Sequence, residues 1–147
     1  MKHPRHKAYE TRPIQTLIVD DSHLVRAMLI DFLRSLPGLE VVGAAGDGKD
    51  ALALMVQRSV DLVVMDLNMP VMDGLQAMLR IREQHPGTRV VLMSMSCTAA
   101  MKARGLKAGC DAFISKEDIH EELVRAIARL FPGSGLFGAS PADENRR

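Results

Sequence analysis

Short apolar runs alternate with amphipathic stretches five times along this chain. The apolar runs are rich in aliphatic and β-branched residues and have no alternating polar face, which is typical of parallel strands covered by helices on both sides. The expected strands are 16–19, 39–44, 62–65, 90–93 and 112–114. We therefore predict an α/β fold in which a doubly wound parallel sheet is built from consecutive βα units.

The stretches between the apolar runs have helical periodicity. The clearest apolar stripe, with spacings of four and three, consists of Ile119, Leu123, Ile127 and Leu130. The first helix is expected to begin after Ser22, whose hydroxyl can cap it, and to stop at Pro37-Gly38. The fourth helix, expected over 98–107, contains Gly105. Glycine costs about 1 kcal/mol relative to alanine inside a helix, so we expect this helix to be the mobile one.

The length of 147 residues is that of one domain with terminal segments. Residues 1–12 are polar and basic, and residues 132–147 combine Pro, Gly, Ser and charged residues without periodicity. We expect a disordered basic tail, a structured domain over 13–131, and a second tail or truncated linker.

Charge and cysteine content narrow the class of protein. Nineteen Lys and Arg against eighteen Asp and Glu give a formal net charge of +1, which favours neither nucleic acid nor a membrane as partner. No apolar stretch approaches the roughly 20 residues that span a bilayer. Cys97 and Cys110 match neither a disulfide framework nor a metal-ligand spacing, so we expect a reduced, cytoplasmic setting.

Polar side chains follow four of the expected strands. Asp20 and Asp21 follow the first strand, Asp66 the third, Ser94 the fourth and Lys116 the fifth. Each has a local explanation, such as a helix cap for Asp20-Asp21 or an Asx-turn for Asp66. In an open parallel sheet, however, the carboxyl ends of the strands meet at one edge, where ligands bind. Converging carboxylates repel one another unless a cation lies among them, and hard oxygen ligands with room for a phosphate indicate Mg²⁺.

These positions together resemble the receiver domain of response regulators, the superfamily of the chemotaxis regulator CheY. The matching stretches are 17–22, 61–74, 90–94 and 108–116, within a resemblance that covers roughly 14–131. Ser94 together with Glu117 after Lys116 is similar to receivers of the NarL and LuxR type. The resemblance implies a flavodoxin-like (βα)5 fold with strand order 2-1-3-4-5.

The resemblance also implies the chemistry of the site. Asp66 would accept a phosphoryl group from a sensor histidine kinase or a phosphotransfer protein, and Lys116 would pair with the phosphoryl oxygens. The implied Mg²⁺ ligands are Asp20, Asp21, Asp66 and the backbone carbonyl of Asn68. The protein would then be a phosphoacceptor that catalyses only its own phosphotransfer and dephosphorylation, and not an enzyme with a separate substrate.

The implied output is a switch in surface shape. The Ser94 hydroxyl would swing toward the phosphoryl group, and Phe113 occupies the position of an aromatic switch residue whose ring turns inward. The fourth helix, the fifth strand and the fifth helix would form the output face, which signals to a downstream effector protein. We expect a monomer or a weak, phosphorylation-dependent dimer.

Two residues depart from the commonest family pattern. Glu117 stands where many receivers have a cis proline, which leaves the geometry of that loop open. Met95, directly after Ser94, is bulkier than the small residue often found there. We expect it to narrow access to the phosphoryl group and to slow phosphorylation by small donors.

Other functions remain open at this stage. Gly43 to Gly48 invites a dinucleotide-binding interpretation, but its spacing is GxxGxG and it follows the second strand. A phosphatase with an aspartyl nucleophile would need an aspartate where Asn68 stands. The chain could instead be the receiver fragment of a DNA-binding transcriptional regulator whose output domain is absent, or an interaction module without phosphorylation. The basic residues of the first segment, Lys2, Arg5, Lys7 and Arg12, could contact phosphates, although we expect no direct nucleic-acid or membrane binding. His23, beside Asp21, is expected at the rim where a kinase's histidine domain would dock.

Overall fold

The structure, a computed structural model, describes residues 12–133, which form alternating strands and helices. The elements are β1 (Ile14–Val19), α2 (His23–Ser35), β2 (Leu39–Ala45), α3 (Gly48–Gln57), β3 (Leu62–Asp66), α4 (Gly74–Gln84), β4 (Arg89–Ser94), α5 (Ala99–Ala108), β5 (Ala112–Ser115) and α6 (Ile119–Leu130). The strands pair in parallel in the order β2-β1-β3-β4-β5. This confirms the predicted fold class and strand order, with strand ends that extend the expected runs by one or two residues.

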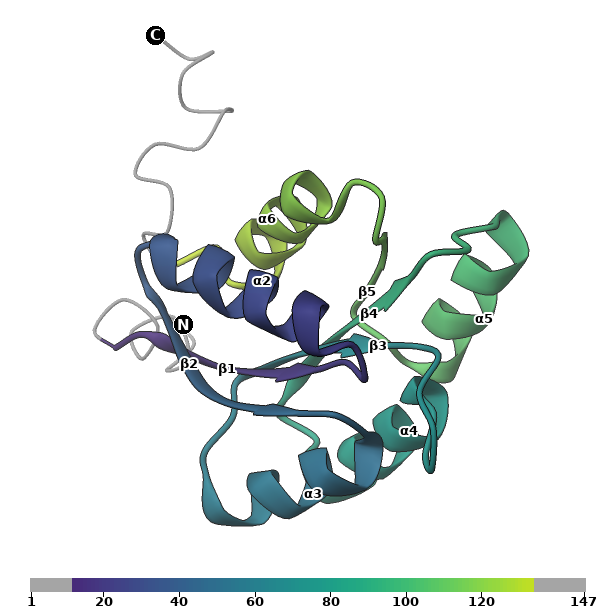
Figure 1. Ribbon diagram of the computed structural model, residues 1–147, viewed down its shortest axis with the longest axis horizontal. Helices are drawn as coiled ribbons and strands as arrows, with labels where there is room; N and C mark the ends of the chain where they lie inside the picture. Colours follow the sequence, from purple (N-terminus) through teal and green to yellow (C-terminus); the bar gives the residue numbers. More distant parts are fainter. Residues whose placement is uncertain (1–11, 134–147) are drawn as a thin grey trace, which may run out of the picture.

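Helices cover both faces of the sheet (Figure 1). On one face, α2 and α6 pack through residues such as Leu29 and Ile127 against Ile18 of β1. On the other face, α3, α4 and α5 pack on Val63 and Leu92 and on their neighbours. Every residue of β3 is buried, because this strand lies between β1 and β4. Its last residue, Asp66, is therefore held in a fixed place at the edge of the sheet.

Helices α2, α3, α4 and α5 begin at side-chain caps, as the sequence predicts for the first of them, whereas the start of α6 has no side-chain cap bond. Ser22 Oγ accepts a hydrogen bond from the backbone N–H of Val25 at 3.2 Å, which starts α2 directly after Asp20 and Asp21. Thr98 caps α5 in the same way. Because the strands are parallel, the loops that follow β1 and β4 lie at the same edge of the sheet.

Helix α5 contains Gly105, as expected, and this glycine is the only one of its residues that is fully buried. The helix therefore meets the sheet mainly through a position without a side chain. The predicted mobility of this helix remains a prediction.

Ion pairs anchor the opposite edge of the sheet. Arg12 forms a two-point contact with Asp61, with N–O distances of 2.6 and 3.0 Å. Asp111 accepts a hydrogen bond from the backbone N–H of Val90 at 2.7 Å and pairs with Arg82. The sequence places Arg12 in the basic tail, but in the structure its guanidinium contacts the domain through Asp61. The rest of the predicted tails, 1–11 and 134–147, lies outside the described residues.

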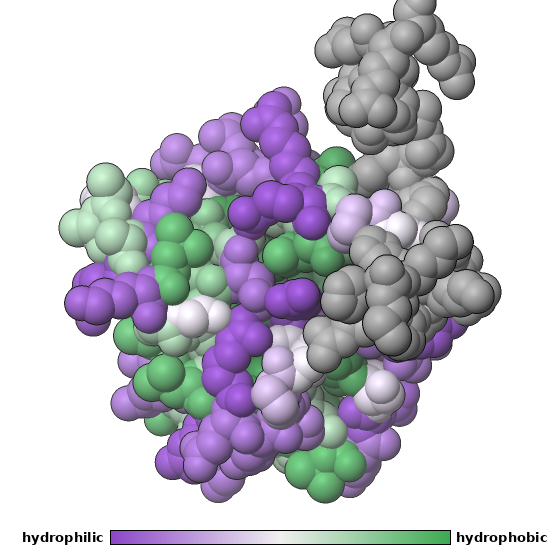
Figure 2. Space-filling model, turned by 180° about the vertical axis from the view of Figure 1, so that it is seen from behind, coloured by the Kyte–Doolittle hydropathy of each residue, from purple (hydrophilic) through white to green (hydrophobic). Residues whose placement is uncertain are grey.

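The surface mixes polar and apolar residues, and on the face shown in Figure 2 strongly hydrophilic residues run between the apolar ones. Within residues 12–133, no helix is long and apolar enough to cross a bilayer. Both cysteines are free. Cys97 is exposed, whereas burial, followed by the charge of Asp111, raises the pKa of the Cys110 thiol to about 11.

Candidate functional site

Three carboxylates from two strand ends converge at the carboxyl edge of the sheet. Asp20 and Asp21 follow β1, and Asp66 ends β3. Each contributes an oxygen atom, and these atoms lie within 4.8 Å of one another. Asp20 is completely buried, Asp66 is 4% exposed and Asp21 lies at the surface. The arrangement is thus a small acidic pocket that opens to solvent on the Asp21 side.

Lys116 reaches into this pocket from the loop after β5. Its Nζ lies 2.7 Å from Oδ2 of Asp20 and 3.2 Å from Oδ2 of Asp66. Burial alone would lower the pKa of the Lys116 ammonium, but its hydrogen bond to Asp20 and the charges of Asp66 and Asp20 outweigh burial and raise it. Lys116 therefore stays cationic and bridges the two buried carboxylates.

The environment of Asp66 disfavours its ionised form. Burial and then repulsion by Asp20 raise the pKa of Asp66, although the charge of Lys116 and a hydrogen bond from the Asn68 N–H act against both. That bond joins Asn68 N to Asp66 Oδ1 at 3.2 Å. One lysine does not compensate for three carboxylates, so the pocket keeps a net negative charge that a cation would relieve.

The loop after Asp66 is closed by backbone contacts. Leu67 continues the sheet by donating to the carbonyl of Met93 at 2.8 Å, and Gly74 donates to the carbonyl of Leu67 at 2.8 Å. A Cβ atom on Gly74 would lie only 2.3 Å from the carbonyl oxygen of Asp66. Only glycine permits α4 to begin this close to the end of β3. The start of α4 thus sets the backbone position of Asp66.

Val71 lies at the tip of the same loop in a conformation that is rare for a β-branched residue. Its φ is 68°, and the N–H of Met72 donates to the carbonyl of Pro70 at 2.7 Å across it, which makes a γ-turn. The Val71 side chain is 78% exposed and therefore gains little packing energy in return. The loop beside Asp66 stores backbone strain.

Replacing Val71 with glycine should stabilise the domain by about 1 kcal/mol, because relief of the left-handed conformation outweighs the added entropy of the unfolded chain. The matched control is Val56→Gly, since Val56 is equally exposed at 78% but lies inside α3. That substitution should instead destabilise slightly, by about 0.5 kcal/mol at most, because glycine is only a little poorer than valine as a helix former. Urea denaturation of both variants measures the difference, and a Val71→Gly variant less stable than wild type would contradict the assignment of strain.

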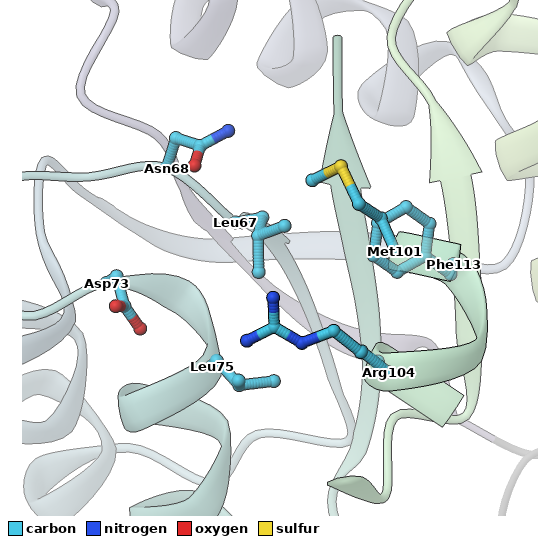
Figure 3. Close-up of a pocket in the computed structure, with 8 residues that line it drawn as sticks. Leu67, Asn68, Asp73, Leu75, Met101, Arg104 and Phe113 are labelled. Carbon is cyan, nitrogen blue, oxygen red and sulfur yellow. The ribbon is translucent and has the colours of Figure 1, made fainter. Parts of the chain in front are cut away.

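The two predicted switch residues lie on neighbouring strands, Ser94 at the end of β4 and Phe113 near the start of β5. Ser94, at the end of β4, is fully buried, and its Oγ accepts a hydrogen bond from the N–H of Ser96 at 3.1 Å. The Phe113 ring in β5 points inward and is 3% exposed. Its neighbours include Met101 of α5, and it lines a cavity with Leu67 and Asn68 of the acceptor loop (Figure 3).

The loop around Lys116 has the geometry that the sequence left open. The described residues contain no cis peptide bond. The N–H of Glu117 donates to Ser115 Oγ at 3.2 Å, a bond that proline could not make. The N–H of Ser115 donates to a carboxylate oxygen of Glu122 in α6 at 2.6 Å. These two bonds hold the segment that carries Lys116.

Sequence reasoning missed two supporting residues. Glu122 is one, and Arg26 of α2 is the other, since its guanidinium donates to the carbonyl of Asp20 at 2.6 Å and contacts Nδ1 of His23 at 3.1 Å. The two bonds span six and seven residues and depend on how each helix packs beside the strand end before it, which no motif in the sequence signals. His23 itself is exposed and begins α2 beside Asp21.

The glycines of the dinucleotide-like run have a packing role. A Cβ on Gly48 would lie 2.7 Å from Cβ of Ala77 and 3.1 Å from Met72. Asp47 caps α3 by accepting from the N–H of Asp50. The glycine therefore allows α3 and α4 to approach each other, which accounts for it without a bound nucleotide.

Comparison with known proteins agrees with the fold and the pocket. The family of the response regulator receiver domain matches residues 16–128, and the chain belongs to this family. The receiver domain of the regulator NarL from Mycobacterium tuberculosis has 30% identity and a TM-score of 0.76, with 83% of this chain and 98% of that chain covered. This confirms the predicted resemblance to receivers of the NarL and LuxR type.

Two further proteins show the range of contexts in which such a domain occurs. A protein-glutamate methylesterase/protein-glutamine glutaminase of Anaeromyxobacter dehalogenans is 35% identical over 143 residues, which are 88% of this chain and 40% of that protein. A CheX-CheY-BeF3-Mg complex from Borrelia burgdorferi has 26% identity and a TM-score of 0.77, with 86% of this chain and 98% of that chain covered. The chain spans between 40% and 60% of the length of the first curated relatives it matches.

Proposed function

We propose that this domain accepts a phosphoryl group on Asp66 in a Mg²⁺-dependent reaction and changes its α5-β5-α6 face in response. The observation that carries the proposal is the pocket of Asp20, Asp21 and Asp66, in which a single ammonium group, from Lys116, contacts two of the three carboxylates. We take Asp66 as the acceptor because it ends the central strand, where its carboxylate lies 3.2 Å from Nζ of Lys116 and accepts a hydrogen bond from the Asn68 N–H.

The residues present fit a magnesium ion. Three carboxylates and one ammonium group leave the pocket with a net charge of about −2, which a divalent cation would neutralise. The oxygen ligands would come from Asp20, Asp21 and Asp66, with the backbone carbonyl of Asn68 as a fourth. When bound, the ion would neutralise charge on the transferring phosphoryl group.

The protein's own residues would then position the acceptor. An oxygen of Asp66 forms a bond to phosphorus as the phosphorus–nitrogen bond of a donor phosphohistidine breaks, and the released imidazole takes a proton from solvent. Lys116 is already within 3.2 Å of Asp66 and can pair with the incoming phosphoryl oxygens. Because a carboxylate is a weak nucleophile, positioning and charge neutralisation provide most of the acceleration.

Phosphorylation adds about two negative charges beside the ends of β3 and β4. Ser94 would exchange its bond from the Ser96 N–H for one to a phosphoryl oxygen, and the inward position of Phe113 would be favoured. The expected donor is a histidine kinase or phosphotransfer protein in the cytoplasm, and His23 and Asp21 lie at the rim where it would approach. The domain would not turn over a separate substrate, and it can serve either alone or as the receiver of a DNA-binding regulator.

The test is incubation of the wild-type protein with acetyl phosphate, with and without Mg²⁺, followed by intact-mass measurement. We expect a single phosphoryl adduct with Mg²⁺ and little adduct after chelation. Reduction of the acyl phosphate with borohydride and peptide mapping should locate it at Asp66. An adduct that is indifferent to the metal, or that maps to another residue, would remove the proposed mechanism.

Met95 lies beside this reaction, since it follows Ser94 directly and its side chain is 62% exposed. We expect Met95→Ala to be phosphorylated several-fold faster by acetyl phosphate, because a smaller side chain opens the approach to Asp66. The rate of adduct formation by intact mass measures the effect. Val56→Ala is the control, because it truncates another exposed apolar residue, in α3, and it should keep the wild-type rate. An unchanged rate in Met95→Ala would show that this side chain does not limit access.

A further inference from the structure

Helix α5 rests on the domain through an unusual contact. Its single fully buried residue is Gly105. A Cβ atom on Gly105 would lie 2.6 Å from Cδ2 and 3.1 Å from Cε2 of the Phe113 ring, and 3.4 Å from Sγ of Cys110. The first distance is too short for two carbon atoms that are not bonded to each other. The ring therefore lies directly against the helix backbone, in space that a side chain at position 105 would otherwise fill.

The same ring borders a cavity that reaches the acceptor loop. The cavity has a volume of about 180 Å³ and is lined by Phe113, Gly105, Met101 and Leu67, among others (Figure 3). Leu67 directly follows Asp66, so the cavity extends from α5 to the loop next to the phosphorylation site proposed above. It also provides room into which the ring can be displaced if its place against Gly105 is taken.

The other residues of α5 add little support. Met101 and Ala108 are partly buried against the core, and Leu106 is 47% exposed. The contact between the Gly105 backbone and the Phe113 ring is therefore a main part of how α5 lies on the sheet. A ring that leaves this place removes that contact.

We propose that Gly105 is a positioning residue that couples Phe113 to α5, so that the ring can be inward only while α5 lies against it. The inference rests on the proposed function, in which the inward ring belongs to the phosphorylated state. Glycine at position 105 then makes the inward state accessible, and any larger residue disfavours it and weakens the response of the α5-β5-α6 face.

The contact itself is tested by a double-mutant cycle in urea. Gly105→Ala should lower the denaturation midpoint when Phe113 is present, because the added methyl group overlaps the ring. In a Phe113→Ala background the same substitution should raise the midpoint, because alanine is the better helix former. If Gly105→Ala changed the denaturation midpoint in the same direction in both backgrounds, the contact between position 105 and the Phe113 ring would be refuted.

The coupling is tested by ¹⁹F NMR on protein labelled with fluorophenylalanine. The chain has four phenylalanines, and Phe113→Leu assigns the signal of interest. In metal-free Gly105→Ala we expect the inward population to fall about tenfold and the amide signals of Lys102 and Leu106 in α5 to shift with it. Ala103→Gly, at an exposed position of the same helix, should lower the midpoint but leave the Phe113 signal in place.

Addition of Mg²⁺ and beryllofluoride completes the experiment. In wild type the population of the inward Phe113 ring should rise further, whereas in Gly105→Ala it should rise less. If the Phe113 signal is unchanged by Gly105→Ala, or if it moves while the α5 amides do not, the coupling is wrong. If instead wild type fails to respond to beryllofluoride and forms no phosphoryl adduct, the proposed function is wrong, and the metal-free comparison still decides the coupling.

Discussion

Replacing Asp66 with asparagine is expected to abolish the phosphoryl adduct and to leave the domain folded. The asparagine oxygen can still accept the bond from the Asn68 N–H, which is 3.2 Å long in the structure, so the loop keeps its shape. An uncharged amide cannot attack phosphorus as a carboxylate does. Intact mass after incubation with acetyl phosphate and Mg²⁺ should show no adduct on the variant.

The same variant should be more stable than wild type in the absence of metal. Burial and repulsion by Asp20 raise the pKa of Asp66 in the folded protein, so the ionised carboxylate costs stability at neutral pH. This cost is absent below the ordinary value of 3.8, grows as the pH rises, and is complete above the raised pKa. Urea denaturation at pH 7 should therefore give a higher midpoint for Asp66→Asn.

Asp47→Asn is the matched control for both measurements. Asp47, like Asp66, is an aspartate between a strand and the next helix, but it caps α3 and takes no part in the acidic pocket. The control should form the adduct at the wild-type rate and should not gain stability. An adduct on Asp66→Asn, or equal rates for Asp66→Asn and wild type, would refute the assignment of the acceptor.

The sequence predicted that these side chains converge, because they occupy strand ends. Asp20, Asp66 and Lys116 each follow an apolar run, and the topology of a parallel sheet brings such positions together whatever the details of packing. Their convergence within 4.8 Å for the carboxylates, and within 3.2 Å for Lys116 and Asp66, follows from the order of β1, β3 and β5.

Gly105 shows where local reasoning ends. Helix propensity treats it as a weak point, and the sequence alone predicted a mobile helix from it. The structure adds a neighbour eight residues away, Phe113, whose ring fills the space that a side chain would need. Propensity counts the cost of glycine in isolation, whereas the contact depends on how α5 and β5 pack. The bonds from Arg26 to Asp20 and from Ser115 to Glu122 escaped prediction for the same reason.

The acidic pocket and the cavity beside Phe113 share one structural element, the loop from Leu67 to Asp73. Its first residues bond to β4 and to Asp66, and Leu67 lines the cavity. A change in charge at Asp66 therefore acts on a segment that also contacts the aromatic ring. This contiguity gives a physical route from the site to α5 that needs no motion of the sheet.

Replacing Gly74 with alanine is expected to have the largest structural effect of any single methyl group added to this domain. Its Cβ would lie 2.3 Å from the carbonyl oxygen of Asp66 and 2.8 Å from Cα of Leu67. Both are backbone atoms, of the last residue of β3 and of the residue after it, and they cannot move aside as a flexible side chain can. We expect a loss of about 3 kcal/mol or more in the free energy of unfolding.

The loss should extend to function, because relief of the clash must displace α4 or the carboxyl end of β3. Either movement shifts Asp66 relative to Lys116, whose Nζ is 3.2 Å from it, and relative to Asp20. Even under conditions where Gly74→Ala is folded, we expect phosphorylation to be at least tenfold slower than in wild type, since misplacement by about 1 Å has effects of this size or larger.

Gly87→Ala is the matched control, because a Cβ at Gly87 would have no neighbour within 4 Å. The same substitution there should be neutral or stabilise by up to about 1 kcal/mol through the unfolded chain. Urea denaturation and the rate of adduct formation, measured on both variants, separate the close approach at Gly74 from the general effect of alanine. If Gly74→Ala matched Gly87→Ala in both measurements, α4 would not set the position of the acceptor, and the geometry of the pocket would need another cause.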